Sequence, residues 1–360
     1  MEKDRGNYLK KLFIIFDFNS WAEAKSWSYV SGYLIIEEMI QAGEGSFDLV
    51  SIPFDYSEDQ VLKVIMPYLD SNNYDHIVIW LPHLRISKKT SNKILEKKLG
   101  IRYFVTESLV YRENEIRLLP HLQYRLGEFL DHYIQEGLVI CFCKETSDEL
   151  NKLGVNVLFK YGYLPHNKIT PRNQKNRVVS YAAVLYNDER IAIHDNLNKI
   201  LIEKLNYCNI VINDSDVLKS KFDIKINEIK AIDRSYADAQ DFHIKRGKLS
   251  LDLLLIRKEI WKNYLETISS CEFIINLPSF FKGLPGRVLE AIYTGVPCLS
   301  INSNLSCEQN SEIFSNGIMS LCRFEDLNDK FLNELRFQPN EEFLKMKFLY
   351  KEEVKKVLGY

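Results

Sequence analysis

Continuous apolar runs alternate with helix-spaced apolar residues along the first half of the chain. The run at 12–18 (LFIIFDF) is typical of a buried strand, whereas 26–41 carries apolar side chains at helical spacing. Because these strands are apolar throughout rather than at every second position, they predict a parallel sheet covered by helices on both faces. The further predicted strands and helices of this half are 47–52, 58–69, 76–81, 88–99, 103–106, 121–135, 138–143, 147–153 and 156–161.

The segment 164–175 (LPHNKITPRNQK) interrupts this alternation. It has two prolines and little apolar content, which is typical of a hinge between domains. The alternation then restarts, but 214–257 gives no clear pattern. The predicted strands and helices after the hinge are 178–185, 191–205, 209–213, 261–269, 272–277, 287–294, 297–301 and 341–358.

These patterns predict an α/β protein with two domains, which fits a chain of 360 residues. We expect two doubly wound, Rossmann-like domains that face each other across a cleft, at 1–165 and 176–340. A C-terminal helix within 341–360 can cross back to the first domain. In such folds the functional sites lie beyond the carboxyl ends of the strands.

Charge and cysteine content narrow the choice of partners and compartment. The formal net charge is −2, which gives no electrostatic reason to expect nucleic acid as a partner. No apolar run reaches the roughly 18 residues of a membrane span. Seven scattered cysteines favour reduced thiols in a cytoplasmic protein. The lysine-rich stretch 219–230 leaves peripheral membrane association open, although its interleaved acids favour a solvated face.

The segment 271–301 (CEFIINLPSFFKGLPGRVLEAIYTGVPCLSI) carries most of the functional information. It predicts a strand, a loop, a helix, a tight turn and a second strand. Gly283 and Gly286 allow the loop to approach a ligand closely, and the following helix directs its first amides at that loop. Arg287 places a cation where the helix dipole disfavours one, as expected at an anion site. Glu290 can accept two hydroxyl hydrogen bonds, as a ribose diol offers.

This segment resembles the donor-binding segment of glycosyltransferases with the B-type fold (GT-B), whose pattern is P-S-x-x-E-G-F-G-x-x-x-x-E-A-x-x-x-G-x-P. The variant GRVLEA resembles the subgroup similar to spore-maturation (CgeB-like) glycosyltransferases, as does 178–190 (VVSYAAVLYNDER). The resemblance implies transfer of a sugar from a nucleotide-sugar donor to a glycan, lipid or protein acceptor, as in polysaccharide biosynthesis. The matching residues, in register without a gap, are Pro278, Ser279, Gly283, Glu290, Ala291, Gly295 and Pro297.

The resemblance also implies a set of donor-binding residues, and the chain departs from the family at some of the usual positions. Lys282 stands where retaining members have a glutamate, and Ala183 stands where a glycine is common. These departures leave the stereochemical outcome open. The implied donor-binding residues are Arg190, Ser279, Lys282, Gly283, Gly286, Arg287 and Glu290.

A catalytic base for the acceptor is expected in the first domain, after the carboxyl ends of strands. Asp17, His83 and Glu107 occupy such positions, although each also suits a helix cap or another structural role. A metal-dependent transferase needs a D-x-D pair at a strand end. Asp214 and Asp216 have that spacing but belong to a loop with helix-capping potential, so we expect no metal and no cofactor.

Two other functions remain open on the same fold. One is an epimerase that hydrolyses UDP-sugars. The other is an inactive relative that binds a nucleotide or glycan as a partner subunit, which the lysine at position 282 keeps open. A dinucleotide-dependent oxidoreductase is excluded, because the first strand is followed by Phe18-Asn19-Ser20-Trp21 instead of G-x-G-x-x-G.

Overall fold

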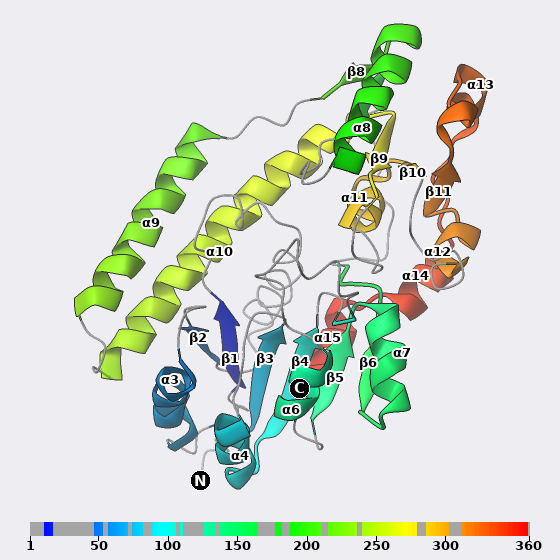
Figure 1. Cartoon of the computed structure of the whole chain (residues 1–360). Coiled ribbons are helices and arrows are strands. Elements are labelled where there is room, and N and C mark those ends of the chain that lie inside the picture. Colours follow the sequence, from blue (N-terminus) through cyan, green and yellow to red (C-terminus); the bar gives the residue numbers. More distant parts are fainter. Residues whose placement is uncertain are drawn as a thin grey trace, which may run out of the picture. The chain divides into compact units, whose positions relative to one another are not determined.

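The described part of the chain forms two compact α/β units (Figure 1). The first unit comprises Met1–Tyr163, Asp216–Lys258 and Leu349–Tyr360, and the second comprises Leu164–Ser215 and Glu259–Phe348. The computed structural model describes residues 11–16, 47–52, 57–70, 74–81, 88–105, 109–110, 126–133, 137–164, 177–181, 188–210, 215–235, 240–278, 286–301 and 311–358.

A six-stranded parallel sheet forms the centre of the first unit, in the order β2-β1-β3-β4-β5-β6. This confirms the parallel sheet expected from the continuous apolar runs. Every predicted strand of this half is present, with ends shifted by a few residues. The strands are β1 (Lys11–Phe16), β2 (Phe47–Ile52), β3 (His76–Leu81), β4 (Gly100–Val105), β5 (Leu138–Cys141) and β6 (Val157–Phe159).

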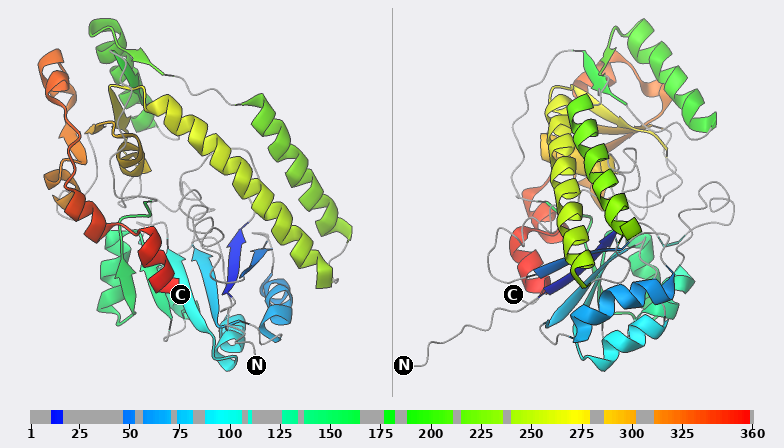
Figure 2. Two further views of the ribbon diagram at one scale, coloured as in Figure 1. Left: turned by 180° about the vertical axis from the view of Figure 1, so that it is seen from behind. Right: turned by 90° about the vertical axis from the view of Figure 1, so that its left-hand side faces the viewer.

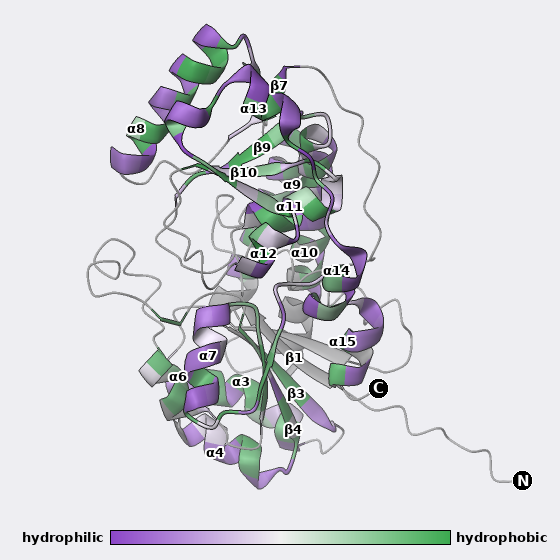
Figure 3. Cartoon of the chain, turned by 90° about the vertical axis from the view of Figure 1, so that its right-hand side faces the viewer, coloured by the Kyte–Doolittle hydropathy of each residue, from purple (hydrophilic) through white to green (hydrophobic). Residues whose placement is uncertain are grey.

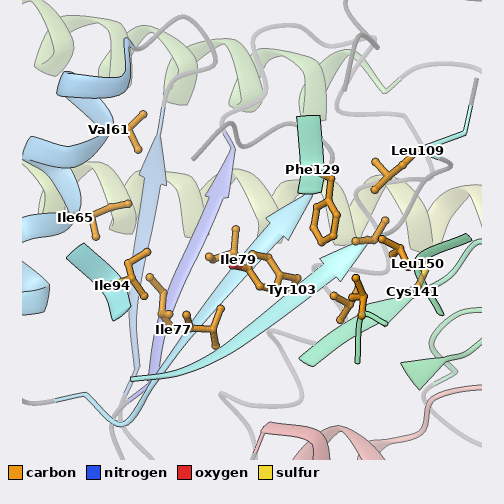
Figure 4. Packing of buried hydrophobic residues seen from close by; sticks show 14 of the residues in the cluster. Val61, Ile65, Ile77, Ile79, Ile94, Tyr103, Leu109, Phe129, Cys141 and Leu150 are labelled. Atoms are coloured by element: carbon orange, nitrogen blue, oxygen red, sulfur yellow. The ribbon is translucent and has the colours of Figure 1, made fainter. Parts of the chain in front are cut away.

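Alternate residues of these strands pack against helices to form the first core (Figure 4). Ile79 and Tyr103 contribute to this core, and the ring of Phe129 meets that of Tyr103 edge-on at 5.7 Å. The next strand residues, Val78 and Phe104, point the other way and are also buried. Burial on both faces explains why these strands are apolar throughout. The helices are α3 (Glu58–Asp70), α4 (Lys88–Glu96), α6 (Leu126–His132) and α7 (Lys144–Lys152).

Two long helices, α9 (Asp216–Ser235) and α10 (Gln240–Ile268), account for most of the stretch 214–257, in which no clear pattern could be predicted. They lie side by side (Figures 1 and 2), and Lys225 forms an ion pair of 3.2 Å with Asp252 across them. The structure groups Asp216–Lys258 with the first unit, whereas the sequence interpretation assigned this stretch to the second domain. The buried stripe of α9 is Leu218, Phe222, Ile226 and Ile229.

The C-terminal segment contains two helices, α14 (Glu341–Lys347) and α15 (Lys351–Leu358), so the prediction of one continuous helix over 341–358 is wrong. The break occurs where Leu349 forms a β-bridge with Tyr163 and donates its amide to the Gly162 carbonyl at 2.8 Å. This exchange of helical for strand-like hydrogen bonds ends α14. It follows that α15, within Leu349–Tyr360, belongs to the first unit.

A partly buried ion pair holds α15 against the rest of the first unit. Lys160 donates to both carboxylate oxygens of Glu353, at 2.7 and 2.9 Å, and only 8% of its side chain is exposed. Arg102 also donates from Nε to the Val357 carbonyl at 2.7 Å. We expect Glu353→Ala to lower the free energy of unfolding by about 1–2 kcal/mol, because the buried ammonium loses two charged hydrogen bonds. Urea unfolding measures this loss.

The neighbouring Glu352 is exposed, and its replacement by alanine is the matched control. Glu352→Ala is expected to stay within about 0.5 kcal/mol of the wild type. Equal effects of the two substitutions would show that the ion pair does not hold α15.

The second unit is built on a five-stranded parallel sheet in the order β11-β10-β9-β7-β8. Its strands are β7 (Val178–Ser180), β8 (Cys208–Asn209), β9 (Phe273–Asn276), β10 (Cys298–Ile301) and β11 (Met319–Cys322). Its helices are α8 (Asp188–Leu197), which continues as a π-helix over Asn198–Lys204, α11 (Gly286–Thr294), α12 (Ser311–Ser315), α13 (Asp329–Glu334) and α14. The last turns of α10 also belong to this unit, and a 3-10 turn lies at Phe324–Asp326.

Hydrophobic residues concentrate on the strands of both sheets, whereas α4, α7 and α15 carry many hydrophilic residues (Figure 3). The second core packs Val179, Phe273 and Leu299 of the sheet against Ile193 and Leu197 of α8. None of the helices in the described ranges is long and apolar enough to cross a membrane.

Candidate functional site

The chain leaves β9 through Leu277 and Pro278 and returns as α11, which packs against β9 and β10. Helical spacing of apolar residues fixes the buried face of α11, which includes Val288, Ala291 and Ile292. The helix ends at Gly295, whose φ of +68° is the left-handed conformation that glycine adopts at little cost. The predicted strand, helix and tight turn are therefore present, while the loop 279–285 lies outside the described residues.

Polar side chains lie at the carboxyl ends of the central strands of this sheet. Asn276 ends β9 and donates from Nδ2 to Ser300 Oγ of β10 at 3.1 Å, and both side chains are buried. Ser180 ends β7 and is fully buried. Polar groups at this edge, under the N-terminus of α11, occupy the position where parallel α/β sheets bind ligands.

Arg190, in the first turn of α8, reaches the point where the chain leaves β9. Its guanidinium donates from Nε to the Pro278 carbonyl at 2.5 Å and from Nη2 to the Leu277 carbonyl at 3.4 Å. Arg190, one of the donor-binding residues expected from the sequence, therefore lies at the carboxyl end of β9. There it fixes the backbone from which the loop starts.

Replacing Arg190 with lysine is expected to lower the free energy of unfolding by about 1–2 kcal/mol, because lysine keeps the charge but loses the forked donor geometry. Glu189→Gln, at the exposed neighbouring position, serves as the control and should change stability by less than about 0.5 kcal/mol. Thermal or urea unfolding measures the stability of both variants. A lysine variant as stable as the wild type would contradict this role.

A buried ion pair within α11 joins the two other charged residues that the sequence singled out. Arg287 Nη1 lies 2.6 Å from Glu290 Oε2, one helical turn further on. Only 12% of the Arg287 side chain and 8% of the Glu290 side chain are exposed. Tyr264, in the last turns of α10, donates its hydroxyl to the same Oε2 atom at 2.8 Å and accepts a hydrogen bond from Arg287 Nη1.

The surroundings of Arg287 and Tyr264 shift the pKa of both side chains upward. Burial lowers the pKa of Arg287, but the Glu290 carboxylate and the Tyr264 hydroxyl more than offset this, so the pKa stands above its usual range. Burial and the Glu290 carboxylate raise the pKa of Tyr264 well above its ordinary value. The arginine therefore stays charged and the tyrosine stays a donor at neutral pH. Trp261 stacks on the Tyr264 ring at 5.5 Å.

The structure places some of the predicted site residues and leaves the others outside its described ranges. Gly286, Arg287 and Glu290 lie together on α11, and Arg190 lies at the end of β9. Tyr264 was not predicted, because it lies 26 positions before Glu290 and only the packing of α10 brings the two together. The predicted residues outside the described ranges are Asp17, His83, Glu107, Ser279, Lys282 and Gly283.

Across the described ranges, no group of three or more His, Cys, Asp or Glu side chains could hold a metal ion. Asp216 lies in the first turn of α9, and Asp214 falls outside those ranges. The expectation that the protein needs no metal or cofactor stays a prediction.

Solved structures similar to this chain match it over nearly its whole length. HepE from Anabaena with UDP-glucose is 9% identical, with a TM-score of 0.52 over 98% of this chain and 98% of that chain. HepE with UDP and glucose is 12% identical, with a TM-score of 0.50 over 98% and 97%. A glycosyltransferase from Rickettsia africae ESF-5 is 10% identical, with a TM-score of 0.50 over 98% and 99%.

No family model and no curated protein matches the sequence of this chain. Structural likeness at such low identity shows the fold. The chain is an α/β protein with two Rossmann-like domains and the GT-B fold.

Proposed function

We propose that the protein is a glycosyltransferase, which moves a sugar from a nucleotide-sugar donor to a glycan, lipid or protein acceptor. The observation that carries this proposal is Glu290, an acidic residue held in one orientation on the helix that follows the loop after β9. The similar HepE structures contain UDP-glucose, or UDP with glucose, which supports a nucleotide-sugar as the donor.

In this proposal the second unit binds the donor. Glu290 accepts hydrogen bonds from the ribose, and the first amides of α11 face the diphosphate. Charge builds on the diphosphate as the glycosidic bond breaks, so fixed amides and the Lys282 cation stabilise the leaving group without a metal. Arg190 orients the start of the loop through the Leu277 and Pro278 carbonyls.

The first unit binds the acceptor in this proposal. A base there, drawn from Asp17, His83 and Glu107, removes the acceptor proton as the new bond forms. We further propose a cytoplasmic enzyme of the CgeB-like subgroup acting in polysaccharide biosynthesis, on the strength of the GRVLEA motif.

Release of nucleoside diphosphate from a panel of nucleotide-sugars, measured with and without mixed glycan and lipid acceptors, tests this function. Acceptor-dependent release that is lost in Glu290→Gln supports a transferase. Release that is complete without any acceptor, together with an altered sugar, would instead identify an epimerase. Binding of a donor without turnover under any condition would identify an inactive relative.

A further inference from the structure

The two carboxylate oxygens of Glu290 have different surroundings. Oε2 accepts hydrogen bonds from both Arg287 and Tyr264. Oε1 accepts none from the residues that the structure describes. One oxygen of this nearly buried carboxylate is therefore fully engaged, and the other is available as an acceptor.

Three hydrogen bonds close a ring around Oε2, and this ring restricts how the carboxylate can rotate. Arg287 Nη1 donates to both Glu290 and Tyr264, and Tyr264 donates in turn to Glu290. Arg287 lies on the same helix as Glu290, whereas Tyr264 comes from α10, so the carboxylate is held from two directions. Trp261 stacks on Tyr264 and meets Tyr293 of α11 edge-on at 6.1 Å, which limits movement of the phenol.

We propose that Tyr264 and Arg287 are positioning residues that hold Oε2 of Glu290, so that Oε1 is presented to a ribose hydroxyl of the donor nucleotide. This inference rests on the proposed function. It also gives Arg287 a role different from the direct contact with the donor that the sequence analysis expects. Because its guanidinium already bonds two partners within the protein, Arg287 acts on the ligand through Glu290.

Nucleotides that lack the ribose hydroxyls separate positioning from a general structural role. We would measure the dissociation constants of UDP, GDP, ADP and CDP, and of their 2′,3′-dideoxy forms, by calorimetry with the full-length protein. Tyr264→Phe is expected to weaken binding of the preferred ribonucleotide about tenfold, the size of effect that one lost hydrogen bond to a charged group produces. Its affinity for the dideoxy form should change by less than about twofold, since that ligand offers Oε1 no hydroxyl.

Two further variants keep the test decisive. Arg287→Lys retains the charge but has no forked donor, so it should weaken binding of the ribonucleotide and leave binding of the dideoxy form nearly unchanged. This variant provides the test if Tyr264→Phe does not fold. Tyr293→Phe removes a hydroxyl from the same aromatic group without touching Glu290, and should leave both affinities unchanged.

Equal weakening of both nucleotide forms by Tyr264→Phe would overturn the positioning role. A wild type that binds both forms equally would also overturn it, while leaving the proposed function in place. Failure of the wild type to bind any ribonucleotide would overturn the proposed function itself, and this inference with it.

Discussion

Replacing Glu290 with alanine is expected to lower the free energy of unfolding by about 3–5 kcal/mol, because it leaves the Arg287 guanidinium in a buried position without its carboxylate partner. Both side chains are nearly buried, so water would screen the remaining charge poorly. Urea unfolding followed by circular dichroism measures the loss. A folded alanine variant within about 1 kcal/mol of the wild type would contradict the burial of this pair.

The control for this prediction removes both charges together. The double variant Arg287→Met, Glu290→Leu is expected to recover most of the lost stability, since apolar residues of similar volume often replace a buried ion pair at little cost. Additive destabilisation in the double variant would mean that the two side chains do not interact. For binding studies Glu290→Gln is the better substitution, because it keeps the shape of the side chain.

Phe273→Ala is expected to lower the free energy of unfolding by about 3–5 kcal/mol, through loss of buried area and creation of a cavity. Phe273 is fully buried in β9, and its ring meets that of Tyr207 edge-on at 5.3 Å. Leu321, on β11 of the same sheet, is 41% exposed and provides the control. Leu321→Ala should cost less than about 1 kcal/mol, and similar losses from both variants would contradict the placement of the core.

The first sheet could be predicted from the sequence because its strands are buried on both faces. Residues such as Val78 and Phe104 fill the second face, and the resulting continuous apolar runs stand out from the helical spacing around them. The longest helices could not be predicted in the same way. The buried residues of α9 form a stripe only one residue wide. Exposed apolar residues such as Val217 and Ile224 obscure the helical spacing of this stripe.

The break between α14 and α15 is also a tertiary effect. The stretch 341–358 has helical spacing, but Leu349 pairs with Tyr163, which is distant in the sequence. A local pattern contains no sign of this partner. The strand β11 was missed because it has only four residues, of which one is exposed and one is a serine that interrupts the apolar run.

The candidate site, too, could be predicted only where it depends on a local motif. Glu290 and Arg287 could be found from the sequence because a local motif spaces them along one helix. Their pairing with each other, and with Tyr264, could not be found, because it depends on how α10 packs beside α11. Tyr264 belongs to a stretch whose helix was predicted only from residue 261 onward.

The central claim is that the protein binds a nucleotide-sugar. The most direct test is a thermal-shift screen of the wild type and Glu290→Gln against UDP-, GDP-, CDP-, ADP- and TDP-sugars. A ligand that binds only the folded state must raise the melting temperature. We expect one nucleotide class to raise the melting temperature of the wild type, and folded Glu290→Gln to lose most of this increase. No shift with any donor, or an equal shift in both proteins, would contradict it.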